Sequence, residues 1–238
     1  MINKLTSETV KEYGLHAGAN AVGIAAAKDF GLAPEGFRPS DHLDSCLSVV
    51  VLGASFPREV LHNTADYTAV RNEMLTKMTN LAKEVAKRIH ADGHKAKTIS
   101  ASGGKTVDGK LYGHISLKHA AELAGLGLIN RNYLLTNPEY GNLLWLSAVL
   151  TSADLLPDQK AQYKTCDNCN KCVEACPLGA LDNPAFFGRK ECSKFFTITN
   201  HKFEIKCYRC RTVCPYCFGK SEQARYCADC DESITERG

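Results

Sequence analysis

The segments CDNCNKCVEACPLGA (residues 166–180) and CYRCRTVCPYC (residues 207–217) decide what this chain can fold into. The first has the cysteine spacing C-x2-C-x2-C-x3-C followed by proline, with the cysteines at Cys166, Cys169, Cys172 and Cys176. Bacterial proteins bind [4Fe–4S] clusters with this spacing, and the fourth cysteine of the run characteristically ligates a second cluster. The run therefore predicts one cluster and indicates that another lies nearby.

The second segment carries a related run, C-x2-C-x3-C-P, whose cysteines are Cys207, Cys210 and Cys214. It is one cysteine short of a full ligand set, so an upstream residue must supply the fourth, and the interval contains Cys192. Soft thiolates suit both iron–sulfur clusters and zinc, but zinc sites usually use two separated C-x2-C pairs. The spacing favours iron–sulfur clusters.

The chain has 238 residues, 44% of them hydrophobic, and a formal charge of +3, which is typical of a globular protein. This length suits one main domain and a smaller one, and the nearly balanced charges argue against DNA or an anionic membrane as a partner. Neither a signal peptide nor a membrane span is evident, so we expect a cytoplasmic protein. There, twelve cysteines indicate metal binding rather than disulfides and suit an anaerobic setting.

Upstream of the cysteines, apolar patterns predict an α+β domain around one core. Buried strands are expected at 21–27, 46–53, 95–101 and 142–151, and helices at 3–17, 67–90 and 116–124. The helix at 67–90 has the clearest apolar stripe, and loops are expected at 29–45 and 101–110. We expect three parts: residues 1–158, a cluster-binding domain at 159–218 and a tail at 219–238.

The order of these motifs resembles epoxyqueuosine reductase and its relatives, which share a core with the reductive dehalogenases. The resemblance rests on the two cysteine runs, on ECSKFFT (191–197) and on KHAAELAGLGLINRNYLLTNPEYGNLLWLSAVLTS (118–152), and extends from about residue 18 to 217. It implies a nitroreductase-like, cobalamin-binder-like N-terminal domain and a ferredoxin-like double-cluster domain. It also implies that two [4Fe–4S] clusters pass single electrons to a base-off cobalamin.

The resemblance implies a crossed set of ligands. The first cluster would be held by Cys166, Cys169, Cys172 and Cys214. The second would be held by Cys176, Cys192, Cys207 and Cys210.

Three departures from the family pattern bear on the substrate. Leu111 stands where the family has a proton-donating aspartate, with Asp108 three residues away. The family's Gly-Lys-Asn is Asn130-Arg131-Asn132, and about twenty residues follow Cys217, so we expect a short form without the family's C-terminal helical repeats. These departures argue against epoxyqueuosine as substrate and against tRNA as partner, and they leave the catalytic residue unassigned.

Other residues are candidates for binding a cofactor. Lys118, His119, Arg131 and Asn132 are the cofactor-binding candidates, and His114 just precedes the first two. Cys217, Cys227 and Cys230 suit a third metal, a redox pair or plain thiols in a tail. Cys46 opens an apolar strand and is expected to be a small buried hydrophobe.

Two functions fit this sequence. In the first, an external donor such as ferredoxin or flavodoxin reduces the clusters, which pass electrons to cobalamin, or as second choice flavin, to reduce a small molecule. In the second, the chain is an electron carrier or activator for a partner such as a corrinoid protein.

Overall fold

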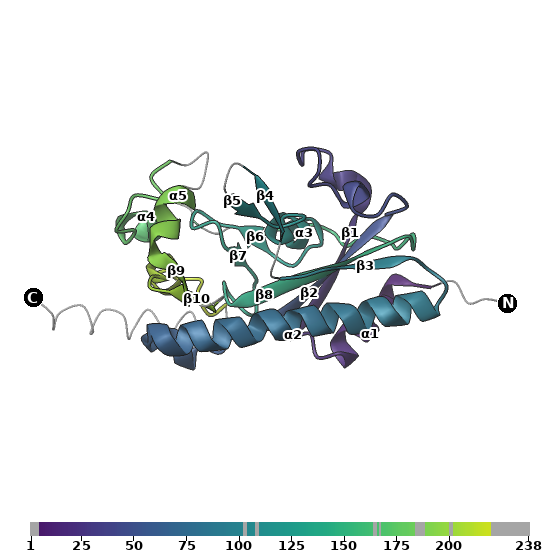
Figure 1. The fold of residues 1–238 in the computed structure, drawn as a ribbon, viewed down its shortest axis with the longest axis horizontal. Helices are drawn as coiled ribbons and strands as arrows, with labels where there is room; N and C mark the ends of the chain where they lie inside the picture. Colours follow the sequence, from purple (N-terminus) through teal and green to yellow (C-terminus); the bar gives the residue numbers. More distant parts are fainter. Residues whose placement is uncertain are drawn as a thin grey trace, which may run out of the picture. The chain divides into compact units, whose positions relative to one another are not determined.

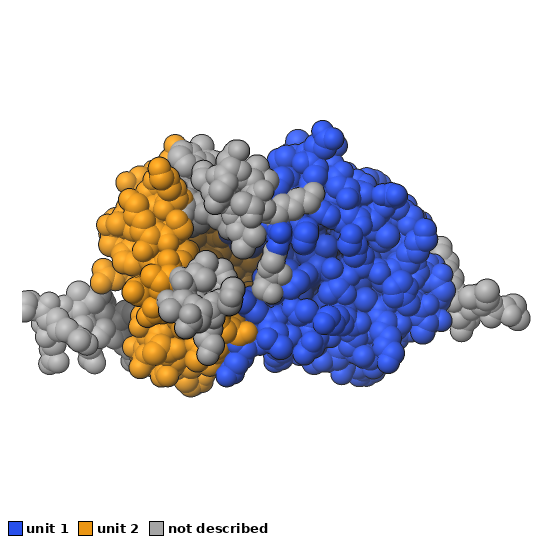
Figure 2. Space-filling view, in the orientation of Figure 1, with its two compact units in different colours: residues 1–55, 73–127, 145–162 blue, residues 56–72, 128–144, 163–238 orange. Residues whose placement is uncertain are grey.

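The computed structural model describes residues 5–101, 104–107, 110–163, 166, 168–183, 189–199 and 202–219. The chain forms two compact units (Figure 2). Unit 1 comprises residues 1–55, 73–127 and 145–162, and unit 2 comprises 56–72, 128–144 and 163–238. The boundary at 162 lies near the expected one, but 56–72 and 128–144 join the cysteine-rich unit instead of the expected 1–158 domain.

Unit 1 is built on a four-stranded sheet of order β1-β2-β8-β3 (Figure 1). The strands are β1 (Ala21–Ala26), β2 (Ser48–Ser55), β8 (Leu144–Thr151) and β3 (Ala96–Ile99). β1 pairs antiparallel with β2, and β3 pairs antiparallel with β8. The inner strands are buried almost throughout, as their unbroken apolar runs predict for strands covered on both faces.

Helices cover this sheet. They are α1 (Ser7–His16), α2 (Thr64–Ala91) and α3 (Leu117–Leu123), and α2 runs along one side of the strands in Figure 1. The stripe expected from 67 to 90 is confirmed, because Met78, Val85 and Ile89 are fully buried. Among the described residues, no helix is long and apolar enough to cross a membrane.

Short elements complete unit 1. η1 (Ala27–Phe30) and η2 (Pro39–Asp41) lie in the expected loop. The segment expected as a loop at 101–110 contains strand β4 (Lys105–Val107) and the first residue of β5 (Lys110–Tyr112), and the two strands pair with each other. Gly125 follows the C-cap residue Ala124 of α3 and has φ of +72°. A Cβ there would lie 2.3 Å from the Gln159 carbonyl oxygen, so only glycine fits.

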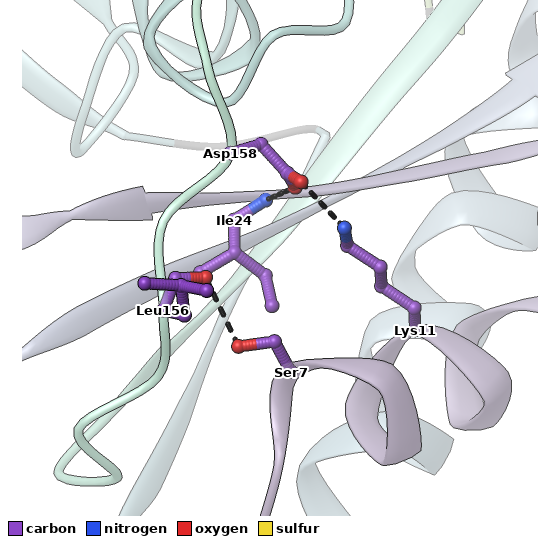
Figure 3. Close-up of polar contacts among 5 residues, drawn as sticks. All are labelled: Ser7, Lys11, Ile24, Leu156 and Asp158. Atoms are coloured by element: carbon purple, nitrogen blue, oxygen red, sulfur yellow. Dashed lines mark hydrogen bonds and ion pairs between the residues drawn. The ribbon is translucent and has the colours of Figure 1, made fainter.

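Polar contacts hold the last segment of unit 1 against α1 and β1 (Figure 3). The Asp158 carboxylate accepts hydrogen bonds from Lys11 Nζ at 2.5 Å and from the Ile24 backbone N–H at 2.9 Å. One turn earlier on α1, Ser7 Oγ donates to the Leu156 carbonyl at 3.0 Å. These contacts fix the chain immediately before it enters the cysteine-rich segment.

Apart from residues 64–72 of α2, the described elements of unit 2 are short: η3 (Glu59–His62), β6 (Leu128–Ile129), β7 (Leu135–Thr136), α4 (Lys171–Glu174), α5 (Arg189–Cys192), η4 (Ser193–Phe195), β9 (Phe196–Thr199), β10 (Lys202–Ile205) and α6 (Arg209–Thr212). β6 pairs with β7, and β9 pairs with β10. Elements of one helical turn bury little apolar surface, so this part needs other cross-links.

Candidate metal centre

Four cysteines line one cavity in unit 2. The cavity is partly open to solvent, and its walls are Asn132, Cys166, Cys169, Lys171, Cys172, Cys214, Pro215 and Tyr216. Three of the cysteines come from the first run, and Cys214 comes from the second. The structure thus brings together the four residues that the family resemblance implied for one cluster.

Local backbone geometry wraps the first run around this cavity. Cys166 and Asn168 have φ of +63° and +55°, and the Cys169 N–H donates to the Cys166 carbonyl at 3.3 Å. Left-handed residues so close together turn the chain sharply, and asparagine tolerates this conformation better than most residues. Cys172 then follows as the second residue of α4.

The second run has a helix like that of the first. Cys210 is the second residue of α6, as Cys172 is of α4, and the two helices pack against each other. Cys176 and Cys214 each follow their helix and precede a proline. Each run thus has a one-turn helix that carries a cysteine at its second position and is followed by Cys-Pro, whereas the left-handed residues Cys166 and Asn168 belong to the first run.

Electrostatic interactions indicate two groups of thiols. Burial, then Cys166 and Cys169, raises the pKa of Cys172, and burial raises the pKa of Cys214 to about 11, with Cys166 and Cys172 adding to it.

In the other group, burial raises the pKa of Cys210 to about 12. Cys192 and Cys207 raise it further, and Arg211 lowers it. Cys172 of the first group also raises the pKa of Cys210, and Cys176 is not among the residues that affect these thiols. That sulfur instead accepts a hydrogen bond from the Ala180 N–H at 3.3 Å, a contact of the kind that tunes cluster sulfurs.

The donor set fits a polynuclear cluster better than a single ion. Four thiols line one cavity, which suits a cubane whose four irons each take one thiolate. None of the ten described cysteines forms a disulfide.

A segment before β8 clamps the second cysteine run through buried side-chain amides. Asn132 Nδ2 donates to the Cys210 carbonyl at 2.9 Å, and Asn142 Nδ2 donates to the Arg211 carbonyl at 3.1 Å. In return, Arg211 Nη1 donates to the backbone oxygen of Asn142 and, at 3.1 Å, to its Oδ1. Sequence reasoning missed Asn142 and Arg211, because each is a single polar residue within a motif read for its cysteines or apolar side chains.

Backbone contacts bring the same segments closer. The Asn142 N–H donates to the Cys217 carbonyl at 3.0 Å. Gly141, with φ of +57°, lies so near that a Cβ would be 2.1 Å from that carbonyl oxygen, and a Cβ on Gly219 would be 2.2 Å from the Glu139 carbonyl oxygen. Glycine permits this approach at both places.

Residues 56–72 contact the chain on both sides of Cys207. Tyr208 stacks on Tyr67 with ring centroids 4.2 Å apart and donates to the Leu61 carbonyl at 3.1 Å. Thr68 Oγ1 accepts a hydrogen bond from the Ile205 N–H at 3.0 Å. These contacts explain why this stretch belongs to unit 2 although it lies far upstream in sequence.

The cofactor-binding candidates fall in different units. Lys118 and His119 lie on α3 in unit 1, where His119 Nδ1 is 2.6 Å from Ser116 Oγ. Arg131 and Asn132 lie in unit 2. Asn132 lines the cysteine cavity, whereas Arg131 Nη2 lies 3.5 Å from the Leu181 and Asp182 carbonyl oxygens.

His114 is placed next to another histidine. Its carbonyl oxygen lies 2.8 Å from His42 Nε2, and the two rings meet edge to face at 5.2 Å. Its own Nδ1 is buried and has no hydrogen-bond partner among the described residues. A polar ligand group could satisfy this nitrogen.

The remaining cysteines divide between core positions and residues outside the described part. Cys46 is buried, burial raises its pKa to about 11, and its thiol donates to the Ser48 carbonyl, which confirms it as a core residue. Cys217 is also buried, with Sγ 3.6 Å from Asn142 Oδ1. Cys227 and Cys230 lie outside the described residues, as does Asp108.

Comparison with known proteins first identifies the class. Residues 162–182 match the family model described as a 4Fe-4S binding domain, which covers the first cysteine run. Together with the cavity lined by four cysteines, this match defines an iron–sulfur protein.

The particular similarity is to epoxyqueuosine reductases. The chain is 36% identical over 119 residues to the enzyme of Bacillus subtilis (strain 168) and 37% identical over 105 residues to that of Synechococcus sp. (strain RCC307). These alignments cover 45% and 40% of this chain. They cover only 31% and 33% of the two relatives, about a third of their length.

Solved structures establish the fold. A crystal structure of selenomethionine-labelled epoxyqueuosine reductase matches with a TM-score of 0.62 and 26% identity, over 88% of this chain and 65% of that one. A variant of the catabolic reductive dehalogenase NpRdhA matches with a TM-score of 0.69 and 19% identity, over 94% of this chain and 36% of that one. The expected α+β, cobalamin-binder-like fold with a ferredoxin-like segment is confirmed.

Proposed function

We propose that this protein is an iron–sulfur reductase. An external donor such as ferredoxin or flavodoxin would reduce two [4Fe–4S] clusters in unit 2, and the electrons would pass to a cobalamin bound by unit 1 to reduce a small molecule. The observation that carries the proposal is the cavity lined by Cys166, Cys169, Cys172 and Cys214, since it joins both cysteine runs in one site.

The chain's own residues would hold the two clusters close together. The cavity cysteines would ligate the first, and Cys176, Cys192, Cys207 and Cys210 would ligate the second. Cys172 raises the pKa of Cys210, which indicates that the two groups of thiols are neighbours. Short distances between such groups favour transfer of single electrons, and the hydrogen bonds from Asn132 and Asn142 would keep the second run in place.

Cobalamin is proposed from the shared fold. One of the solved neighbours is a reductive dehalogenase described as B12-dependent, with a TM-score of 0.64 and 19% identity. When bound, cobalamin would supply the reduced cobalt that does the chemistry. In unit 1, the buried Nδ1 of His114 offers a hydrogen-bonding position for a cofactor or substrate, and Lys118 and His119 follow it on α3.

The class of substrate depends on whether the protein acts on a small molecule, on tRNA or on a partner protein. We expected no tRNA, but one structure with a TM-score of 0.61 is an epoxyqueuosine reductase with a tRNA-Tyr stem loop, of which this chain covers 64%. A tRNA stem loop therefore belongs among the compounds tested, beside small molecules. The second candidate function is a carrier that reduces a corrinoid protein, and Leu111 at the place of the family's aspartate favours it.

Anaerobic purification followed by iron analysis tests the proposal. We expect about eight irons per chain, as two clusters require. Adding cob(II)alamin should give a stoichiometric complex whose cobalt is reduced when the clusters are reduced. Eight irons without cobalamin or flavin binding would support the carrier, and about four irons would refute the assignment of two clusters.

Matched variants sharpen this experiment. Cys214→Ala should remove iron from the site that joins the two runs, whereas Cys46→Ala removes a thiol of similar burial that lies in unit 1 and should keep the full iron content. Equal iron in wild-type protein and Cys214→Ala would show that Cys214 is not a ligand.

A further inference from the structure

Exposed cations flank three cysteines of unit 2, which are Cys192, Cys207 and Cys210. Each of these cysteines has an exposed lysine or arginine within two residues of it in the sequence. The cations are Lys190, Lys194, Lys206 and Arg209. Because all four side chains are exposed, a partner that approaches this part of unit 2 meets them first. We call these four residues the cationic surface.

The fold brings the two halves of the cationic surface together. Phe195, the last residue of η4, accepts a hydrogen bond from the Lys206 N–H at 2.9 Å. Next to this bond, β9 and β10 pair with each other. The chain at Lys194 therefore lies beside the chain that leads into Cys207, although the two are far apart in sequence.

Acidic side chains offset this charge only in part. In the described stretches 190–197 and 204–210 the acids are Glu191, which is half-buried, and Glu204, which is exposed. The Glu204 carboxylate lies 3.8 Å from Lys206 Nζ and accepts a hydrogen bond from Thr197 Oγ1 at 2.9 Å. The side chains of Glu204 and Lys206 are both more than half exposed, so water and salt screen their attraction. Cations outnumber acids here.

The first cysteine run has the opposite balance. In the described stretch 168–182 the exposed charges are Lys171, Glu174 and Asp182, so acids outnumber cations. Positive charge is therefore concentrated near one of the two groups of thiols. A surface with one sign of charge attracts partners of the opposite sign and raises their rate of association about 10- to 1000-fold.

We propose that the cationic surface is the docking site of an acidic one-electron donor protein, and that electrons enter the chain through the cluster beside it. This inference rests on the proposed function, since it requires the second cluster and an external donor. In the transfer the donor loses one electron and the cluster gains it, and no bond forms or breaks. The cationic surface acts on the rate of encounter more than on affinity, as charges at the rim of an interface do.

Anaerobic stopped-flow reduction of the iron-loaded protein tests the proposal, with reduced flavodoxin as the acidic donor. At about 10 mM ionic strength charges act over about 30 Å, and there Lys194→Glu/Lys206→Glu should lower the second-order rate constant about tenfold. At about 1 M salt, where this range falls to about 3 Å, the variant and the wild type should differ by less than about twofold. Equal rate constants at low salt would overturn the proposal.

The methyl viologen radical cation distinguishes docking from damage to the cluster. It is also a one-electron donor, but it is positively charged, so the cationic surface repels it. At low salt it should reduce Lys194→Glu/Lys206→Glu at least as fast as it reduces the wild type. If viologen and flavodoxin both reduce the variant more slowly, the two lysines maintain the cluster rather than dock a donor, and the proposal is wrong.

Lys83→Glu/Lys87→Glu is the matched control. It makes the same change in charge at two exposed positions of α2 that belong to unit 1. Its rate constant with flavodoxin should fall by less than about twofold, because steering depends on where the charge lies. A fall as large as that of Lys194→Glu/Lys206→Glu would show that net charge alone controls the rate, and would contradict the proposal.

A neutral variant and iron analysis complete the test. Lys194→Gln/Lys206→Gln makes half the change in charge, so its rate constant should fall about threefold, and it decides the matter if the charge reversal loses iron. An unchanged rate constant in that variant would again overturn the proposal. Wild-type protein with about four irons would instead refute the two-cluster function itself.

Discussion

The substitution Asn142→Ala should destabilise unit 2 by more than the removal of one ordinary surface contact would. The side chain donates to the Arg211 carbonyl at 3.1 Å and accepts from Arg211 Nη1 at 3.1 Å, and Asn142 is only 2% exposed. Leaving a buried carbonyl unsatisfied costs about 1–3 kcal/mol, and a hydrogen bond to a charged group contributes about 1.5–3 kcal/mol. We therefore expect a loss of about 4 kcal/mol in the free energy of unfolding.

Anaerobic urea unfolding of the iron-loaded protein measures this loss. With a slope of about 2.5 kcal/mol per M, the midpoint should fall by about 1.5 M. Cluster absorbance reports unit 2, and fluorescence of Trp145, the single tryptophan, reports unit 1. The cluster signal should be lost first.

Asn130→Ala is the control for this prediction. Asn130 is 7% exposed, and its Nδ2 donates to Thr136 Oγ1 at 2.8 Å within the β6–β7 segment rather than to the cysteine run. It should cost about 1 kcal/mol and leave the order of the two signals unchanged. If the urea midpoint of Asn142→Ala falls by less than about 0.4 M, or by no more than that of Asn130→Ala, Asn142 does not stabilise the second cysteine run as argued.

The remaining predictions concern backbone, core and pH. Gly141→Ala should release iron, because its Cβ would lie 2.1 Å from the Cys217 carbonyl oxygen. The control Gly93→Ala also has positive φ but nothing within 4 Å, so it should lower the free energy of unfolding by about 1 kcal/mol and keep its iron. Equal iron retention in the two variants would contradict this prediction. Met78→Ala, in the buried stripe of α2, should lower the free energy of unfolding by about 2–5 kcal/mol, as measured by thermal unfolding. The exposed control Lys77→Ala should lower it by about 0.5 kcal/mol or less. Similar values for the two variants would argue against the stripe as part of the core. The metal-free protein should lose stability as pH rises above about 9. Burial raises the pKa of Cys46 and Cys214 to about 11 and that of Cys210 to about 12. In this pH range the folded state therefore keeps thiol protons that the unfolded state releases. A urea midpoint that is constant from pH 8 to 10.5 would refute this sign.

Much of the fold was predictable from local patterns. The stripe Met78, Val85 and Ile89 predicted α2, and the apolar runs predicted β2 and β8, because side-chain periodicity reports burial directly. The hairpins β4–β5 and β9–β10 were not predicted, since strands of three or four residues carry too few alternations to recognise.

The sequence alone predicted that the chain binds metal and which cysteines form each run, because short spacings in a loop constrain ligands locally. The family resemblance implied that Cys214 joins the first run, and the structure places it in that cavity. Only the tertiary structure assigned residues 56–72 and 128–144 to the same unit. It also decided which of two neighbouring arginines is buried. The physical reason is that these features depend on contacts between segments far apart in the chain, through amides, carbonyls and one guanidinium, and no periodicity or spacing encodes such partners.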